Sequence, residues 1–189
     1  MRPIPLALAC ALVLACCGGA PRGVSKPDRP VIRAVVAPIE GGRAAVLVTA
    51  GVWAPLDRKA GDPIVLQHQD VRGAAIALYF REAELNSVVE DEVNRWAMMM
   101  LSAPMVFRVT GVTNPVYPSD SEGSFTLEGE DKGVKMAAKC LIRHLGDPTA
   151  DYWVLIFSVS PASMKAEAFA EVDKISKSLK LVPPKRPQP

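Results

Sequence analysis

Residues 152–159 read YWVLIFSV, and this nearly all-apolar run decides the fold of the chain. A strand that is buried on both faces shows such a run, whereas a strand with one wet face alternates apolar and polar residues. Gly146-Asp147-Pro148 supplies a turn directly before it. We therefore expect residues 152–159 to form the central strand of a sheet and to pair with the segment on the other side of this turn.

That preceding segment, residues 134–142 (VKMAAKCLI), shows the clearest alternation in the chain. The pattern predicts a strand of an antiparallel sheet, with one apolar face and one face turned toward water. We expect the face that carries Lys139 to lie under a helix near the C-terminus. Cys140 falls on the apolar face and is expected to be an inert core residue. The apolar face comprises Val134, Met136, Ala138, Cys140 and Ile142, and the other comprises Lys135, Lys139 and Arg143.

Further short strands are predicted by β-branched and apolar runs between turn residues. Residues 111–123 (GVTNPVYPSDSEG) are instead rich in turn-forming residues and predict a loop. The expected strands are Val31–Val36, Ala44–Val48, Ile64–Gln67, Ala74–Phe80, Met105–Val109 and Ser124–Leu127.

Two helices are expected. The first begins at Ser87, where Ser87 and Glu90 have the spacing of a capping box, and it ends before Pro104. The second begins at Ser160-Pro161, a cap residue followed by proline at the first helical position. Its apolar stripe consists of Ala168, Val172, Ile175 and Leu179.

These elements predict an α+β domain over residues 31–182, with an antiparallel sheet of six or seven strands and two principal helices. Residues 183–189 (PPKRPQP) cannot continue a helix and are expected to form a disordered, proline-rich tail.

The order of elements resembles the PsbP-like fold, which is shared by a photosystem II extrinsic subunit, a Ran-binding nuclear import factor and bacterial DcrB-type lipoproteins. The local similarity lies in residues 151–157 (DYWVLIF), which lead to a helix that closes with residues 175–181 (ISKSLKL). Val52-Trp53 is similar to an early glycine–tryptophan turn of the family, although Val52 separates Gly51 from Trp53. The resemblance implies a binding, chaperone or assembly role and no shared catalytic residues.

The N-terminus has the pattern of an export signal. Arg2 is followed by an apolar run from Ile4 to Ala15, which is too short to span a bilayer. Residues 13–16 (VLAC) resemble the lipobox of bacterial lipoproteins, in which the cysteine becomes the acylated N-terminus. We therefore expect residues 1–15 to be a signal peptide that is removed, and residues 16–30 to be a lipidated, flexible tether rich in glycine and proline.

Cys16 is the favoured lipidation site, because cleavage there places the small residue Ala15 at position −1. Cys17 is the alternative, but it would place Cys16 at that position. Position +2 is then a cysteine and not the aspartate associated with inner-membrane retention. We therefore expect a lipid anchor in the bacterial cell envelope, most simply in the outer membrane.

The net charge of +2 gives no reason to expect a nucleic-acid partner. His68 and His144 lie far apart in sequence without other ligands in metal-site spacing, and both are expected to face solvent. No nucleophile-elbow, phosphate-loop or dinucleotide-binding pattern occurs. We therefore expect no metal, no cofactor and no enzyme.

The expected function is a non-enzymatic module that docks other envelope proteins or binds a ligand; the alternative is an envelope hydrolase whose site is assembled from scattered residues. Val116 and Tyr117 are the candidate partner-binding residues, since Pro115 and Pro118 stiffen the segment and tyrosine is an effective interface anchor. The other possibility is that Tyr117 folds back onto the core.

Overall fold

The computed structural model describes residues 32–39, 42–57, 62–102, 107–147 and 150–182. Its larger sheet is antiparallel, with strands in the order β3-β4-β5-β10-β9-β8-β6 and β7 added beside β8. These strands are β3 (Trp53–Pro55), β4 (Ile64–His68), β5 (Ala75–Glu82), β6 (Arg108–Val112), β7 (Val116–Ser119), β8 (Glu122–Asp131), β9 (Val134–Asp147) and β10 (Ala150–Pro161).

A smaller three-stranded sheet has the order β1-β2-β11, made of β1 (Ile32–Ile39), β2 (Gly42–Thr49) and β11 (Lys180–Val182). Two α-helices are described, α2 (Val89–Ser102) and α3 (Lys165–Ser178), with a 3-10 turn η1 (Ala162–Met164) before α3. The expected α+β class with an antiparallel sheet and two helices is confirmed. The larger sheet has eight strands, because β3 adds to one edge and β7 pairs with β8 beside β6 at the other.

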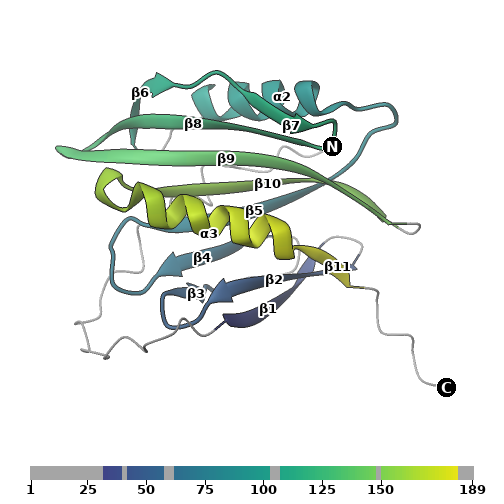
Figure 1. Cartoon of the computed structure of the whole chain (residues 1–189), viewed down its shortest axis with the longest axis horizontal. Coiled ribbons are helices and arrows are strands. Elements are labelled where there is room, and N and C mark those ends of the chain that lie inside the picture. Colours follow the sequence, from purple (N-terminus) through teal and green to yellow (C-terminus); the bar gives the residue numbers. More distant parts are fainter. Residues whose placement is uncertain (1–31, 40–41, 58–61, 103–106, 148–149, 183–189) are drawn as a thin grey trace.

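The two helices lie on opposite faces of the larger sheet (Figure 1). Helix α2 packs through Val93 and Trp96 on one face, together with alternate residues of β5, β8, β9 and β10. Helix α3 and the small sheet form one layer on the other face, where Val172 and Ile175 pack with Leu141. The face of β9 that carries Lys139 therefore lies under α3, as expected. It is largely covered rather than wet, since Leu141 and Ala137 are buried there.

A two-residue turn at Lys132 and Gly133 joins β8 to β9. Both residues have positive φ angles, 48° and 84°, which match the twist of an antiparallel hairpin. The turn fixes the register in which Asp131 faces Val134 and Phe125 faces Cys140. Cys140 is fully buried, as the alternation predicts, and burial raises the pKa of its thiol.

The second helix does not begin at Ser160. Ser160 and Pro161 are the last residues of β10, and α3 starts only at Lys165 with Met164 as its N-cap. The sheet pairing of β10 with β9 extends through both residues, so strand pairing overrides the local cap signal. The apolar stripe itself is confirmed, because Ala168, Val172, Ile175 and Leu179 are all buried.

Hydrogen bonds from β2 attach the small sheet to α3. The carboxylate of Glu171 accepts the backbone N–H of Thr49 at 2.8 Å and the Thr49 hydroxyl at 2.9 Å. Ser178 Oγ accepts the N–H of Leu47 at 3.0 Å. The side chains of α3 thus satisfy donors on the edge of β2 that β11, which pairs only with residues 43–45, does not reach.

Candidate docking groove

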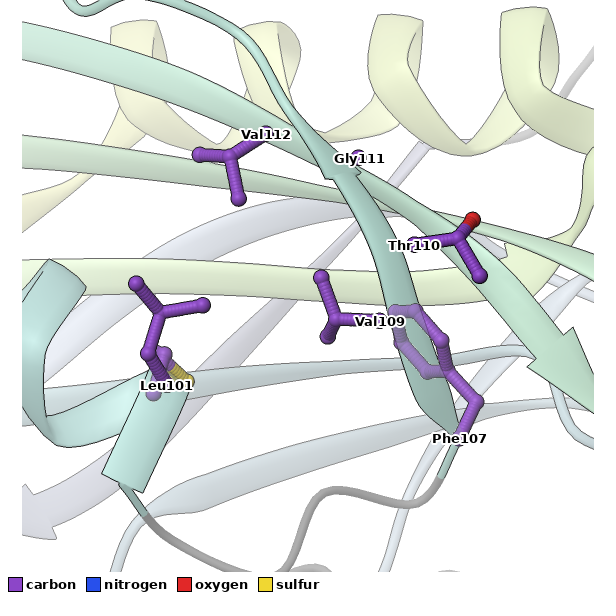
Figure 2. Close-up of a pocket in the computed structure, with 7 residues that line it drawn as sticks. Leu101, Phe107, Val109, Thr110, Gly111 and Val112 are labelled. Atoms are coloured by element: carbon purple, nitrogen blue, oxygen red, sulfur yellow. The ribbon is translucent and has the colours of Figure 1, made fainter.

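An open groove of about 490 Å³ lies between the C-terminal end of α2 and the edge strand β6 (Figure 2). Its side chains are mainly apolar, with one hydroxyl from Thr110, but polar atoms contribute more of the exposed lining surface than apolar atoms do. The lining residues are Met100, Leu101, Phe107, Val109, Thr110, Gly111 and Val112.

Helix α2 supplies one wall of the groove. Met100 points into the core and is buried, whereas Leu101, one residue later on the helix, is 53% exposed at the groove. Met98 is 69% exposed and stands one turn before Leu101. The end of α2 therefore presents flexible apolar side chains to solvent.

Strand β6 supplies the other wall. Its side chains alternate, so that Val109 is half-buried while Thr110 and Val112 are exposed. Figure 2 shows Leu101, Val109 and Val112 gathered around the hollow, with the ring of Phe107 behind Val109. Val109 pairs with Gly129 of β8 and Gly111 with Glu128, and a bulge lies between the two pairs.

Gly129 allows β6 to lie close to β8. A Cβ atom at this position would stand 2.1 Å from the carbonyl oxygen of Arg108 and 2.6 Å from Cδ2 of Phe107. No side chain fits in that space. The position of the β6 wall therefore depends on a glycine in the neighbouring strand.

Residues 111–123 were expected to form a loop, but this prediction was wrong. The segment contains the end of β6, all of β7 and the start of β8. Val116 and Tyr117 lie in β7 and are 61% and 38% exposed. The Tyr117 ring also packs toward the core: a Cβ at Gly123 would stand 3.1 Å from its Cδ1 and 2.6 Å from Cγ2 of Val93 on α2. Tyr117 therefore lies beside α2, at the other end of the same helix–edge interface as the groove, and whether it binds a partner stays a prediction.

Two charged residues join α2 to β5 on the side of the helix away from the groove. Glu92 is fully buried and forms an ion pair with Arg81. Nε of Arg95 lies 3.7 Å from Oε1 of Glu92. Arg95 and then Arg81 also bind Glu84 and lower the pKa of its carboxyl. This network holds α2 against β5, so we interpret it as structural.

His68 is buried, which corrects the expectation that it faces solvent. Its Nδ1 accepts the backbone N–H groups of Asp70 and Val71, both at 3.1 Å, and its ring meets Trp53 edge-on at 5.1 Å. The imidazole thus replaces a backbone acceptor in the turn after β4. The spacing of residues in the sequence does not reveal that a histidine side chain accepts hydrogen bonds within a turn.

His144 is partly exposed, and its Nε2 lies 2.7 Å from Oδ1 of Asp151 across the β9–β10 hairpin. Its backbone N–H bonds to the carbonyl of Ser121, but the Ser121 hydroxyl bonds to that of Ser119. Within the described residues, no group of three or more histidine, cysteine or acidic side chains could hold a metal ion. Neither described helix has the length and hydropathy to cross a bilayer.

Cys16 and Cys17, the candidate lipidation sites, lie outside the described residues, as do the signal segment 1–15, the tether and the tail 183–189. The two walls of the groove could not be found by sequence reasoning. Leu101 falls within the first expected helix, and Val112 within the expected loop 111–123. Only the residue type gave a signal, since both are apolar at positions that the fold leaves uncovered.

No known protein family and no curated protein matches this sequence. Solved structures with a similar fold include LpqN of Mycobacterium tuberculosis, described as involved in cell envelope biogenesis, at 12% identity and a TM-score of 0.48, covering 80% of this chain and 92% of LpqN. The Ran-binding protein Mog1p of Saccharomyces cerevisiae is similar at 10% identity and a TM-score of 0.49, covering 81% and 97%.

The cyanobacterial PsbP of Synechocystis sp. PCC 6803 is also similar, at 12% identity and a TM-score of 0.48, covering 87% of this chain and 98% of that protein. A PsbP is thus among the proteins that this chain is similar to. At these identities and scores we transfer no function and no residue role from any of the three.

Proposed function

We propose that this chain is a non-enzymatic, lipid-anchored lipoprotein of the bacterial envelope, which docks another envelope protein in the groove between α2 and β6. The observation that carries the proposal is the groove itself: an open hollow whose side chains are mainly apolar, beside exposed Met98, Leu101 and Val112. Clustered exposed apolar side chains with polar surroundings mark candidate interaction sites.

The chemistry of the lining favours docking over catalysis. An active site needs several convergent polar or titratable groups, and this lining offers one threonine hydroxyl. The volume would admit a small apolar ligand. A protein segment fits better, because β7, with exposed Val116 and Tyr117, pairs with the same strand β8 that β6 pairs with.

The position of β6 indicates the kind of segment. Among the described strands, β6 is the last of its sheet and pairs on one side only, with β8. An edge strand with free backbone groups can accept an extended peptide as an additional strand. We therefore expect the partner to contribute an extended segment with apolar side chains that enter the groove.

A paired comparison tests the groove. The double variant Leu101→Ser/Val112→Ser replaces an exposed apolar side chain on each wall of the groove. The double variant Val116→Ser/Tyr117→Ser replaces the exposed side chains of β7. Leu85→Ser is the control, because Leu85 is 93% exposed just before α2, at the end of this helix opposite the groove. We expect both double variants to weaken recovery of the same cross-linked envelope protein, at nearly unchanged melting temperature, while the control keeps it.

If Val116→Ser/Tyr117→Ser destabilises the domain and recovery follows only the folded fraction, then Tyr117 is structural. If Leu101→Ser/Val112→Ser also recovers the partner normally, the groove is not the docking site and the proposal is wrong.

The anchor has its own test. We expect Cys16→Ser to leave an unprocessed precursor without acyl label. Acyl labelling that survives Cys16→Ser and is lost in Cys17→Ser would move the lipidation site by one residue.

The alternative, an envelope hydrolase, has one observation in its favour, the His144–Asp151 pair with Ser121 beside it. A general base oriented by a carboxylate is part of a nucleophilic site, but the Ser121 hydroxyl bonds to Ser119 instead of the imidazole. Ester or amide hydrolysis that is abolished by both His144→Gln and Ser121→Ala would establish the enzyme.

A further inference from the structure

The small sheet has an outer face that is turned away from α3 and from the larger sheet. Alternate residues of β1 and β2 point into the core beside α3, among them Val35, Ala37, Val46 and Val48. The residues between them point outward. The outer face comprises Ile32, Ala34, Val36 and Pro38 of β1, Arg43, Ala45 and Leu47 of β2, and Lys180 and Val182 of β11.

The outer face is apolar at its centre. Ile32, Val36 and Leu47 are 46%, 44% and 41% exposed. The register places Leu47 opposite Ala34, and Val36 opposite Ala45. Residues in opposite register positions have adjacent side chains, so these form one continuous patch instead of scattered contacts.

The charged side chains on this patch itself are positive. Arg43 lies on the central strand β2 between Pro38 and Val182, and Lys180 lies on β11 opposite Ala45. At the margin, Lys174 of α3 reaches the Thr49 hydroxyl and is paired there with Glu171. None of the described residues of β1, β2 and β11 is acidic.

The chain sequence puts this face near the expected lipid anchor. Fifteen residues separate Cys16 from Ile32, the first residue of β1. A coil of that length, which the glycine- and proline-rich sequence leads us to expect, would span about 20 Å. The tether carries Arg22, Lys26 and Arg29 against Asp28, and Lys185 and Arg186 follow β11, so both segments have a net positive charge.

We propose that the outer face of the small sheet rests on the surface of an anionic membrane leaflet, with its apolar side chains at the headgroup boundary and Arg43 and Lys180 against lipid phosphates. An apolar surface with a cationic margin is the combination that binds such interfaces. The proposal rests on the lipid anchor of the proposed function. It also orients that function: α2 packs on the opposite face of the larger sheet, so the groove faces away from the bilayer (Figure 1).

Depth-dependent fluorescence quenching of the full acylated chain tests this orientation. The protein, with Cys17→Ser to remove a competing thiol, is reconstituted in phosphatidylglycerol vesicles that contain nitroxide-labelled lipids. An environment-sensitive fluorophore is attached at Val36→Cys on the outer face or at Val112→Cys in the groove; buried Cys140 is protected from the reagent. We expect strong quenching and a blue shift at position 36 and neither change at position 112.

The cations are tested in the same vesicles. Each Lys or Arg at an anionic surface contributes about 1 kcal/mol, so Arg43→Gln and Lys180→Gln should each lower the ratio of surface-bound to free domains about fivefold. Arg108→Gln is the matched control, because Arg108 is exposed on β6, at the edge of the larger sheet opposite to β3. Circular dichroism establishes that each variant is folded.

Equal quenching at positions 36 and 112, or no quenching at position 36, overturns the proposal. So does unchanged quenching in Arg43→Gln/Lys180→Gln. A position-36 label that is shielded from aqueous quenchers without lipid contact, in a chain with the mass of a dimer, would assign the face to a second copy instead. Failure of the anchor is distinct, because a chain without acyl groups would not float with the vesicles in any variant.

Discussion

The indole N–H of Trp153 donates a hydrogen bond of 2.7 Å to the hydroxyl of Ser87, which joins the central strand β10 to the residue that leads into α2. The backbone N–H of Ser87 bonds in turn to the carbonyl of Glu84 at 3.0 Å, and not to the Glu90 side chain as a capping box requires. Ser87 therefore attaches the start of the helix to the core of the sheet.

Replacing Ser87 with alanine should destabilise the domain, because the buried Trp153 N–H loses its acceptor. We expect the free energy of unfolding in urea to fall by about 1–3 kcal/mol, the cost of leaving a buried donor unsatisfied. Ser163→Ala is the control, since Ser163 is exposed in η1. Equal stability of the two variants would show that Trp153 finds another acceptor.

Gly129→Ala should disrupt the wall of the groove. The added methyl group would meet the backbone oxygen of Arg108, which cannot move without shifting β6, and such overpacking costs about 1–3 kcal/mol. We expect a lower melting temperature together with weaker partner recovery. Gly111→Ala lies in β6 itself, but its Cβ would be 4.0 Å from the nearest atom, so the melting temperature of this variant should not change.

A chain that ends before Ser160 lacks α3 and β11 and should aggregate. Tyr152, Val154 and Ile156 of β10 would lose the cover of Val172 and Ile175 on that face. We expect size-exclusion chromatography with light scattering to give large soluble aggregates or no soluble protein. A well-folded monomer would contradict this expectation.

Stability should fall at acidic pH in part through Glu128. The ammonium of Lys165, 2.8 Å away, lowers the pKa of this carboxyl from its ordinary value of 4.5. A carboxyl whose pKa is lower in the folded state stabilises the fold above its unfolded pKa, and this contribution disappears as pH falls through the lower folded value. Glu128→Gln should therefore flatten the pH dependence of the melting temperature below about pH 4.5, with a small effect because the pair is exposed.

Cys140 should react slowly with thiol reagents in the native domain. The side chain is fully buried, and burial raises the pKa of the thiol, so neither access nor thiolate is available. Labelling followed by mass spectrometry should show fast modification only in denaturant. Fast native labelling would indicate an accessible and reactive site.

The sequence predicted those parts of the fold whose periodicity and burial agree. Alternation over residues 134–142 and the apolar run 152–159 correspond to parts of β9 and β10, and the stripe of the second helix is buried as expected. The predicted start of that helix at Ser160 was wrong because a twelve-residue strand continues through Ser160-Pro161. The helix-cap pattern depends on neighbouring residues, so it cannot show that Ser160 and Pro161 pair with Ala137 and Met136 of another strand.

The candidate site was less accessible to prediction. Val116 and Tyr117 were chosen for chemistry and do lie partly exposed, but their segment forms strands because β8 pairs with both β6 and β7. The groove depends on how closely β6 approaches β8 at Gly129 and on which side of α2 remains uncovered. Both features arise from tertiary packing, which leaves no periodic pattern of apolar residues in the sequence.

The central strand β10 separates two apolar cores and contributes to each. Trp153, Leu155, Phe157 and Val159 belong to the core under α2, and Tyr152, Val154 and Ile156 belong to the core under α3. Neither core can open without exposing one side of this strand to water. The two layers are therefore coupled in free energy, and the domain, when pulled at the N-terminal end of β1, would resist as one cooperative unit instead of yielding layer by layer.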